Sequence, residues 1–163
     1  GSKGIIKVIN ERDFDKYKHN IGKDLIMQPV VGSNEEEYTV SGFFDNSSRL
    51  IDYIPFRRKL SKDGFTQEAH VVDFDFSIVL TDLALAFNPI GPTNFQFRLD
   101  GEAIKLLEIN PRISSATSIR ASLGYNESIM SVNYFLNNQI PIKMDKSEII
   151  NKLAIRYMED YIF

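Results

Sequence analysis

The sequence predicts an α+β domain in which pairs of antiparallel strands are interrupted by helices. Two kinds of pattern support this prediction. Runs rich in β-branched and aromatic residues flank strong turn signals, so strands that are neighbours in the sequence are expected to pair. Apolar runs of helical length end at Asn-Pro or at Gly, both of which terminate helices. With 163 residues, of which 43% are hydrophobic, the chain can bury a substantial core.

The first part of the chain is expected to contain short elements followed by a meander of strands. Asn10 is a typical N-cap residue, and Asp45-Asn46-Ser47-Ser48 is a strong turn between two β-rich runs. In chain order, the expected elements are a strand over 5–9, a helix over 11–19, a buried strand over 25–31, paired strands over 37–44 and 49–56, and an irregular basic segment over 57–67.

The second part is expected to alternate helices with one further strand pair. Asn88-Pro89 stops the first of these helices, and Gly124 suits a left-handed C-terminal cap for the second. In chain order, the expected elements are a helix over 75–87, strands over 94–99 and 104–110, helices over 118–123 and 127–136, and a tail over 153–163 that favours a strand over a helix.

Composition excludes several classes of protein. The formal net charge is −3 and the sequence pI is about 5.4, whereas nucleic-acid-binding proteins usually present a basic face. The absence of Cys excludes a disulfide scaffold, a thiolate metal site and a Cys nucleophile. The longest apolar stretch, 74–87, contains Asp75 and Asp82 and is too short to span a bilayer. These observations predict neither nucleic-acid nor membrane partners, and we expect a cytoplasmic protein.

The strand pair over 94–110 leaves its register open between two alternatives. A tight Asp100-Gly101 turn, which the dipeptide favours locally, would place Phe95 and Phe97 on the same face as Glu108. A loop of three or five residues would instead place Gln96 opposite Glu108, with Asn94 opposite Asn110, Phe95 opposite Ile109 and Phe97 opposite Leu107. We expect the odd-numbered loop, because it separates the apolar from the polar residues.

In the expected register, one face of the strand pair gathers oxygen donors from Gln96, Glu108 and Asn110, with Asn94 beside them. Carboxylate and amide oxygens suit Mg²⁺, which often shares its coordination with substrate phosphates. Spacing alone is more often explained by a solvated sheet face that happens to be polar. A metal site is the alternative that needs further support.

That support comes from Glu108-Ile109-Asn110-Pro111-Arg112. Together with Asn94-Phe95-Gln96 upstream, and with a Ser-rich turn and helix reaching Gly124 downstream, this stretch resembles the ATP-grasp superfamily. The greatest similarity is to the synthetase domains of the carbamoyl-phosphate synthetase large chain and to related carboxylate–amine ligases. The resemblance implies that Gln96, Glu108 and Asn110 bind magnesium (or manganese), that Arg112 binds the transferred phosphate, and that Arg58, with Lys62, assists on the phosphates.

Two upstream segments resemble the same family. The run 26–32, followed by Glu37-Tyr38-Thr39-Val40, is similar to the family's adenine strand and the strand after it. By resemblance, Gln28, Val30 and Val31 would line the adenine pocket, and Glu37 would accept hydrogen bonds from the ribose. Ser2-Lys3-Gly4-Ile5 is similar to a Gly-rich loop that closes over phosphates, so Gly4 would allow close approach to the nucleotide.

The resemblance implies that 25–163 form an ATP-grasp C-terminal subdomain, an antiparallel sheet flanked by helices, and that 1–24 are a partial N-terminal lid. It also implies an ATP- and magnesium-dependent ligase that activates a carboxylate or bicarbonate as an acyl phosphate for attack by an amine. Both substrates would be small molecules, and a homodimer is left open. We expect the chain to be part of a longer enzyme and inactive alone. A non-catalytic nucleotide-binding or regulatory remnant is the alternative.

Overall fold

The computed structural model describes residues 4–33, 35–61, 64–157 and 162. The chain divides into two compact units, 1–31 and 32–163. The boundary between the units follows residue 31, later in the sequence than the expected boundary between 24 and 25. The assignment of the first unit to a lid stays a prediction. No helix in the described ranges is both long enough and apolar enough to cross a membrane.

The first unit contains one helix and little other regular structure. Helix α1 (Glu11–Tyr17) is followed by the short 3-10 helix η1 (Lys18–Asn20), and the Asn10 side chain accepts a hydrogen bond from the backbone N–H of Asp13, as expected of an N-cap. The strands predicted over 5–9 and 25–31 are wrong. Both segments are irregular, and the described backbone of this unit pairs only at a single bridge between Ile21 and Leu25.

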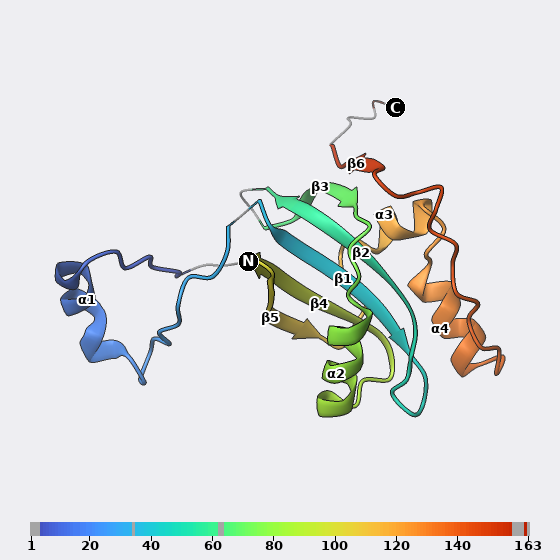
Figure 1. Ribbon diagram of the computed structural model, residues 1–163, viewed down its shortest axis with the longest axis horizontal. Helices are drawn as coiled ribbons and strands as arrows, with labels where there is room; N and C mark the ends of the chain where they lie inside the picture. The colour runs from blue at the N-terminus through green and yellow to red at the C-terminus, as the bar shows by residue number, and fades with distance from the viewer. Residues whose placement is uncertain (1–3, 34, 62–63, 158–161, 163) are drawn as a thin grey trace. The chain divides into compact units, whose positions relative to one another are not determined.

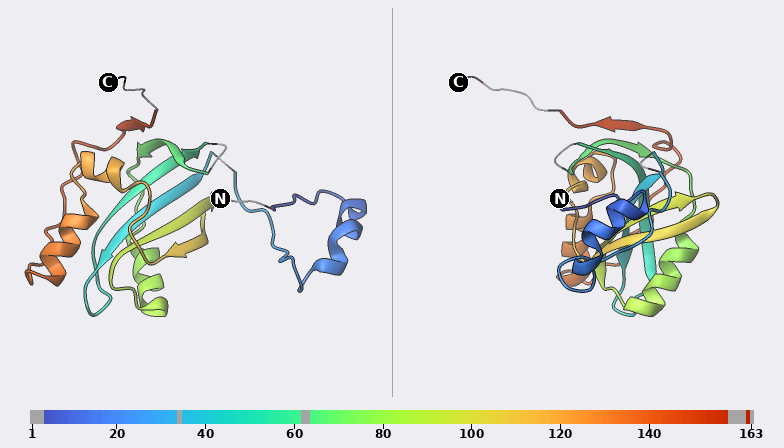
Figure 2. Two further views of the ribbon diagram at one scale, coloured as in Figure 1. Left: turned by 180° about the vertical axis from the view of Figure 1, so that it is seen from behind. Right: turned by 90° about the vertical axis from the view of Figure 1, so that its left-hand side faces the viewer.

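The second unit is built on a six-stranded antiparallel sheet with the order β5-β4-β1-β2-β3-β6. Helix α2 packs on one face of this sheet, and helices α3 and α4 lie over the other face (Figures 1 and 2). The elements are β1 (Glu37–Phe44), β2 (Leu50–Leu60), β3 (Thr66–Val71), α2 (Ser77–Phe87), β4 (Gly91–Asp100), β5 (Ala103–Asn110), α3 (Thr117–Ser122), α4 (Glu127–Phe135) and β6 (Leu153–Ile155). The predicted fold class is confirmed.

Most predicted elements of this unit are present, with one error before α2. The segment 57–67 was expected to be irregular, but β2 continues to Leu60 and β3 begins at Thr66. The three consecutive basic residues do not interrupt β2, because Arg57, Arg58 and Lys59 each pair with a residue of β3. Lys62 lies outside the described residues. Gly124 adopts a positive φ after α3, as its predicted capping role requires, and α2 ends at Asn88-Pro89 as expected, with Asn88 also at a positive φ.

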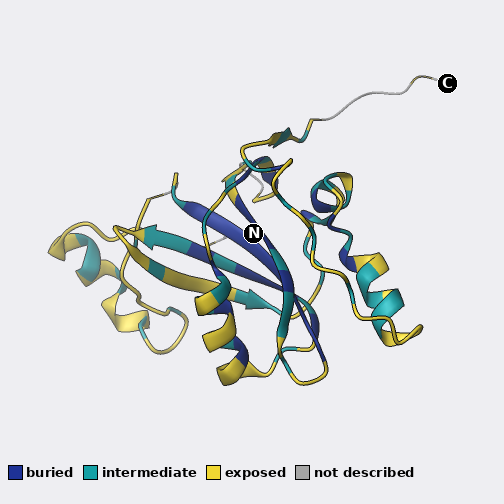
Figure 3. Cartoon of the chain, turned by 45° about the vertical axis from the view of Figure 1, so that its right-hand side comes forward, coloured by how far each residue is buried: buried dark blue, intermediate teal, exposed yellow. Residues whose placement is uncertain are grey.

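The two faces of the sheet bury separate hydrophobic clusters. Figure 3 shows the buried residues as dark blue stretches along the strands. The cluster under α2 is largely aromatic and consists of Tyr38, Val40, Phe44, Phe76, Leu80, Ala84, Phe95 and Phe97. The cluster under α3 and α4 consists of Ile54, Phe56, Ala69, Val71, Tyr125 and Ile149. The second cluster covers only β2 and β3. On the same face, β1, β4 and β5 carry the polar residues Thr39, Ser41, Asn94, Gln96 and Glu108, while the buried Phe43 of β1 packs against Tyr134 and Phe135 of α4.

The strand pair β4–β5 has a two-residue Gly101-Glu102 loop, which neither alternative predicted, and it reaches the register expected of the odd-numbered loop from Gln96 to Asn94. Asp100 pairs with Ala103, so the loop contains two residues, and the prediction of an odd-numbered loop is wrong. Phe97 pairs with Leu106 rather than with Leu107, but a register shift after Gln96 then places Gln96 opposite Glu108 and Asn94 opposite Asn110. A β-bulge thus absorbs the extra residue. The polar face is built as predicted although the turn is tight.

We expect Asn126→Ala to lower the free energy of unfolding by about 1 kcal/mol, because the side chain of Asn126 caps α4. Its Oδ1 accepts hydrogen bonds from the backbone N–H groups of Ser128 and Ile129, both at 3.1 Å. Urea denaturation would measure the loss. Asn133→Ala inside the same helix is the control, and it should change the free energy by less than about 0.5 kcal/mol. Equal losses in both variants would contradict the capping role.

Candidate active site

The three predicted metal ligands lie on one face of the β4–β5 pair. Gln96 and Glu108 are directly opposite each other, and Asn110 follows Glu108 on the same face because strand side chains alternate. Gln96 and Asn110 are half-buried and Glu108 is exposed, so the set forms a rim that a ligand in solution can reach. Gln96 also pairs with Thr39 of β1, which places this rim on the side of the sheet that faces α3 and α4.

The donor set suits a magnesium ion that is shared with phosphates. Within the described residues, no group of three or more His, Cys, Asp or Glu side chains could form an all-protein metal site. Glu108 supplies one carboxylate, while Gln96 and Asn110 supply neutral amide oxygens. Because Mg²⁺ is usually held by one or two carboxylates plus substrate phosphates, these residues fit it as a nucleotide-bound ion.

Glu37 lies beside this rim, between two arginines. Its Oε1 accepts from Arg58 Nη2 at 2.7 Å and its Oε2 from Arg98 Nη2 at 2.8 Å. The carboxylate side chain is only 9% exposed. Burial raises the pKa of Glu37, but hydrogen bonds from Arg98 and Arg58 outweigh burial and hold the pKa below its usual value. Glu37 is therefore a fixed anion, and its predicted contact with the ribose stays a prediction.

Arg58 connects Glu37 to the predicted metal ligands. The same Nη2 atom that contacts Glu37 also donates to Gln96 Oε1 at 2.7 Å. The Arg58 side chain is 11% exposed, so its guanidinium is held against the sheet rather than extended into solvent. An amide oxygen has two lone pairs, so Gln96 could accept from Arg58 and still face a cation. The predicted phosphate-binding arginine and one predicted metal ligand are thus in direct contact.

Arg112 lies in the loop that follows β5. Its backbone N–H donates to the Asn110 carbonyl at 2.7 Å, which places it at a tight turn immediately after the last predicted metal ligand. The residue is exposed, and its Nη1 reaches the Ile113 carbonyl at 3.4 Å. An exposed guanidinium fork at this position has the geometry to bind phosphate oxygens.

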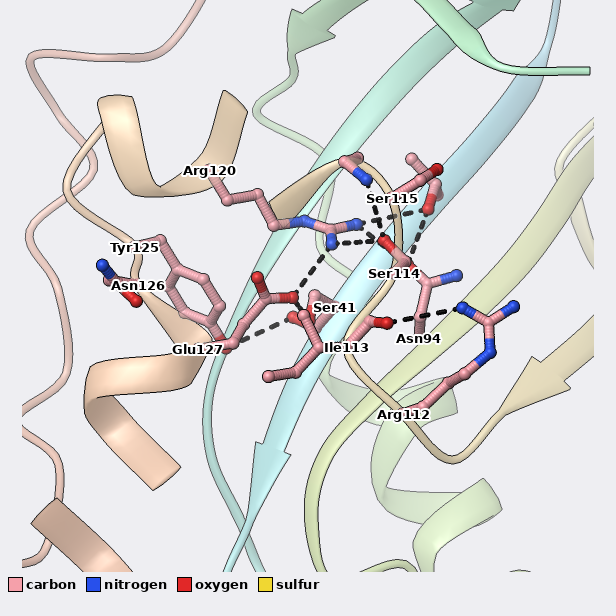
Figure 4. Close-up of polar contacts among 12 residues, drawn as sticks. Ser41, Asn94, Arg112, Ile113, Ser114, Ser115, Arg120, Tyr125, Asn126 and Glu127 are labelled. Atoms are coloured by element: carbon pink, nitrogen blue, oxygen red, sulfur yellow. Dashed lines mark hydrogen bonds and ion pairs between the residues drawn. The ribbon is translucent and has the colours of Figure 1, made fainter. Parts of the chain in front are cut away.

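A buried polar network lies next to this site and was missed from the sequence. Arg120 and Glu127 are both 0% exposed, and Arg120 Nη1 contacts Glu127 Oε1 at 2.9 Å (Figure 4). Arg120 also donates to Ser114 Oγ at 2.8 Å and to Asn94 Oδ1 at 2.9 Å. The Arg120 guanidinium is enclosed between α3 and the sheet and is not accessible to a substrate. The only sequence signal was a lone Arg in a helix with apolar neighbours.

The predicted adenine-binding residues belong to the first unit, whereas the residues described above belong to the second. Gln28, Val30 and Val31 lie in an irregular segment, and Gly4 has a φ of +84° that favours glycine. Ser2 and Lys3 lie outside the described residues. The adenine and phosphate-loop roles therefore stay predictions.

Comparison of folds shows which class of protein this sheet and its flanking helices define. The N5-carboxyaminoimidazole synthetase from Staphylococcus aureus, solved in complex with ADP, superposes with a TM-score of 0.65 at 12% identity, over 87% of this chain and 40% of that chain. The N5-carboxyaminoimidazole ribonucleotide synthetase from Thermus thermophilus gives 0.60 at 13% identity, over 82% and 39%. The fold of this chain is similar to that of these two synthetases. A sequence search of curated proteins found no match.

A family model shows the particular family. The model described as "ATP-grasp in the biosynthetic pathway with Ter operon" matches residues 23–161, which is most of the chain. The chain belongs to this ATP-grasp family, and the predicted superfamily is confirmed. It spans about two fifths of the length of the two synthetases it resembles in fold.

Proposed function

We propose that this chain is the metal- and phosphate-binding part of an ATP-dependent ligase of the carbamoyl-phosphate synthetase type. The enzyme would activate a small carboxylate, or bicarbonate, as an acyl phosphate that a small amine then attacks. One observation carries the proposal: the β4–β5 register brings Gln96, Glu108 and Asn110 onto one face, with Arg58 in contact with Gln96. A module that only bound a partner would have no need of this set.

The residues of the chain have separate roles in this reaction. The oxygens of Glu108, Gln96 and Asn110 would hold magnesium, which when bound neutralises charge on the phosphates of ATP. Arg112 would bind the transferred phosphoryl group through its planar fork. Arg58 would contact the remaining phosphate oxygens, so that the growing negative charge meets fixed cations. Phosphoryl transfer depends mainly on such positioning and charge stabilisation. The roles proposed for these residues are all of this kind.

The other residues with proposed nucleotide roles belong either to the first unit or to the second. Gln28, Val30 and Val31 would present backbone groups to adenine, and Glu37 would accept hydrogen bonds from the ribose hydroxyls. Gly4 would let the loop approach the phosphates. The S. aureus synthetase, solved in complex with ADP, supports nucleotide binding by a fold of this kind.

The test uses the intact protein that contains this chain. The enzyme is incubated with ATP, MgCl₂, ammonium and [¹⁸O]bicarbonate, then with other ¹⁸O-labelled carboxylates, and both ADP release and ¹⁸O in phosphate are measured. Carboxylate-dependent ADP release with ¹⁸O transferred to phosphate is expected, because an acyl phosphate leaves a carboxylate oxygen on phosphorus when it is displaced. Nucleotide binding without ADP release for any carboxylate would favour the non-catalytic alternative, and absence of nucleotide binding would overturn the proposal.

A further inference from the structure

The buried network around Arg120 lies on the same face of β4 and β5 as the predicted metal ligands, next to Asn94. Arg120 comes from α3, and Glu127 from the start of α4 points towards it over the sheet, as Figure 4 shows. The guanidinium contacts residues of α4, of β4 and of the loop after β5 within 2.9 Å. Burial lowers the pKa of Arg120, while the adjacent Glu127 carboxylate favours its charged form.

The contacts of Arg120 first affect the strands that carry the predicted metal ligands. Arg120 Nη2 donates to Asn94 Oδ1 at 2.9 Å, and Thr39 donates to the same oxygen at 2.8 Å. Asn94 is directly opposite Asn110 in the sheet. The two donors fix the side chain of the residue next to a predicted metal ligand, and Thr39 is in turn paired with Gln96.

The contacts of Arg120 also affect the loop that carries Arg112. Arg120 Nη1 donates to Ser114 Oγ at 2.8 Å, and Ser114 lies two residues after Arg112 and four after Asn110. The same Nη1 contacts Glu127 Oε1, which also accepts from Ser41 Oγ at 2.6 Å. The guanidinium therefore ties the loop after β5 to a fixed point on β1 and α4.

We propose that Arg120 is a positioning residue that sets the geometry of Asn110 and Arg112 for the metal–nucleotide complex. It touches neither substrate nor metal, and the proposal rests on the proposed function. Only a guanidinium serves here, because one planar fork must reach Ser114, Glu127 and Asn94 at once, whereas the ammonium of a lysine is a point donor. Some groups hydrogen-bond to metal ligands and orient them without touching the metal. Removing such a group weakens metal binding by about 10- to 100-fold.

The test measures Mn²⁺ binding by electron paramagnetic resonance in the intact protein with ADP, and ADP binding in EDTA. Arg120→Lys should weaken Mn²⁺ binding by roughly tenfold, with ADP affinity in EDTA unchanged within about twofold. If Arg120 only maintained the fold, Arg120→Lys would lower the fraction of the protein that binds Mn²⁺, or it would weaken Mn²⁺ binding and ADP binding together. Ser114→Ala breaks one contact of the network at little risk to folding, and it should weaken Mn²⁺ binding in the same direction.

Arg156→Lys is the matched control, because Arg156 contacts the same loop at the Ser115 carbonyl, and α3 at Ser118, without a hydrogen bond to Asn94. It should leave Mn²⁺ binding unchanged. Wild-type Mn²⁺ affinity in folded Arg120→Lys, or an equal loss in Arg156→Lys, would overturn the inference. If Arg120→Lys does not fold, wild-type Mn²⁺ affinity in Ser114→Ala overturns it. If the wild-type protein binds no ADP, the proposed function fails and the inference fails with it.

Discussion

Replacing Glu108 by Gln in the intact protein should lower magnesium-dependent ATP turnover by on the order of 100-fold or more. Glu108 is the one carboxylate among the predicted metal ligands, and it lies opposite Gln96 on an exposed rim. Gln preserves the size of the side chain but removes its negative charge, so a divalent cation loses its strongest protein ligand. Steady-state ADP release at increasing MgCl₂ would measure both the rate and the midpoint of metal activation.

The structure offers a control for this variant in the same hairpin. Glu102 lies in the exposed two-residue loop between β4 and β5, so Glu102→Gln changes the net charge of the strand pair equally without altering the rim. Turnover of Glu102→Gln should remain within about twofold of wild type, because exposed charges at a distance are screened by salt. Wild-type turnover in Glu108→Gln would refute the assignment of the metal site. Both variants should unfold at similar urea concentrations, since neither carboxylate is buried.

The juxtaposition of the three predicted metal ligands could be predicted from the sequence because Gln96, Glu108 and Asn110 belong to one strand pair. Glu108 and Asn110 share a face by strand alternation alone, and the polar and apolar residues of the hairpin separate only if Gln96 lies opposite Glu108. The turn could not be predicted in the same way. Asp100-Gly101 and the face pattern indicated conflicting loop lengths, and the conflict is resolved by a bulge after Leu106 that neither signal encodes.

The two errors in the first unit and the Arg120 network have a common cause. Residues 5–9 and 25–31 have the apolar content of strands, but a strand needs a partner, and apart from one bridge the described backbone of that unit offers none. From the sequence alone, Arg120 resembles an exposed cation on a helix, whereas in the structure it contacts Glu127 and Asn94. The absence of these strands and the burial of Arg120 both depend on partners that are distant in the sequence. Local sequence patterns carry no information about such partners.

Glu37→Gln should lower the free energy of unfolding at pH 7 by about 3 kcal/mol. The variant leaves Arg58 and Arg98 facing each other without the carboxylate that separates them, and breaking a buried ion pair costs about 3–5 kcal/mol. We expect the lower end of that range because the Arg98 side chain is 21% exposed. Glu68→Gln is the control: Glu68 forms an exposed pair with Lys59, and its loss should cost less than about 1 kcal/mol.

The pH dependence identifies the origin of this loss. The native pKa of Glu37 lies below its unfolded value of 4.5, so its contribution to stability is fully present above that value and is lost as the pH falls through the native pKa. A protonated Glu37 resembles Gln. The difference between wild type and Glu37→Gln, measured by urea denaturation from pH 7 downwards, should therefore be constant to about pH 5 and shrink below it. A difference that stays constant below the native pKa would mean that lost packing, rather than the lost anion, destabilises the variant.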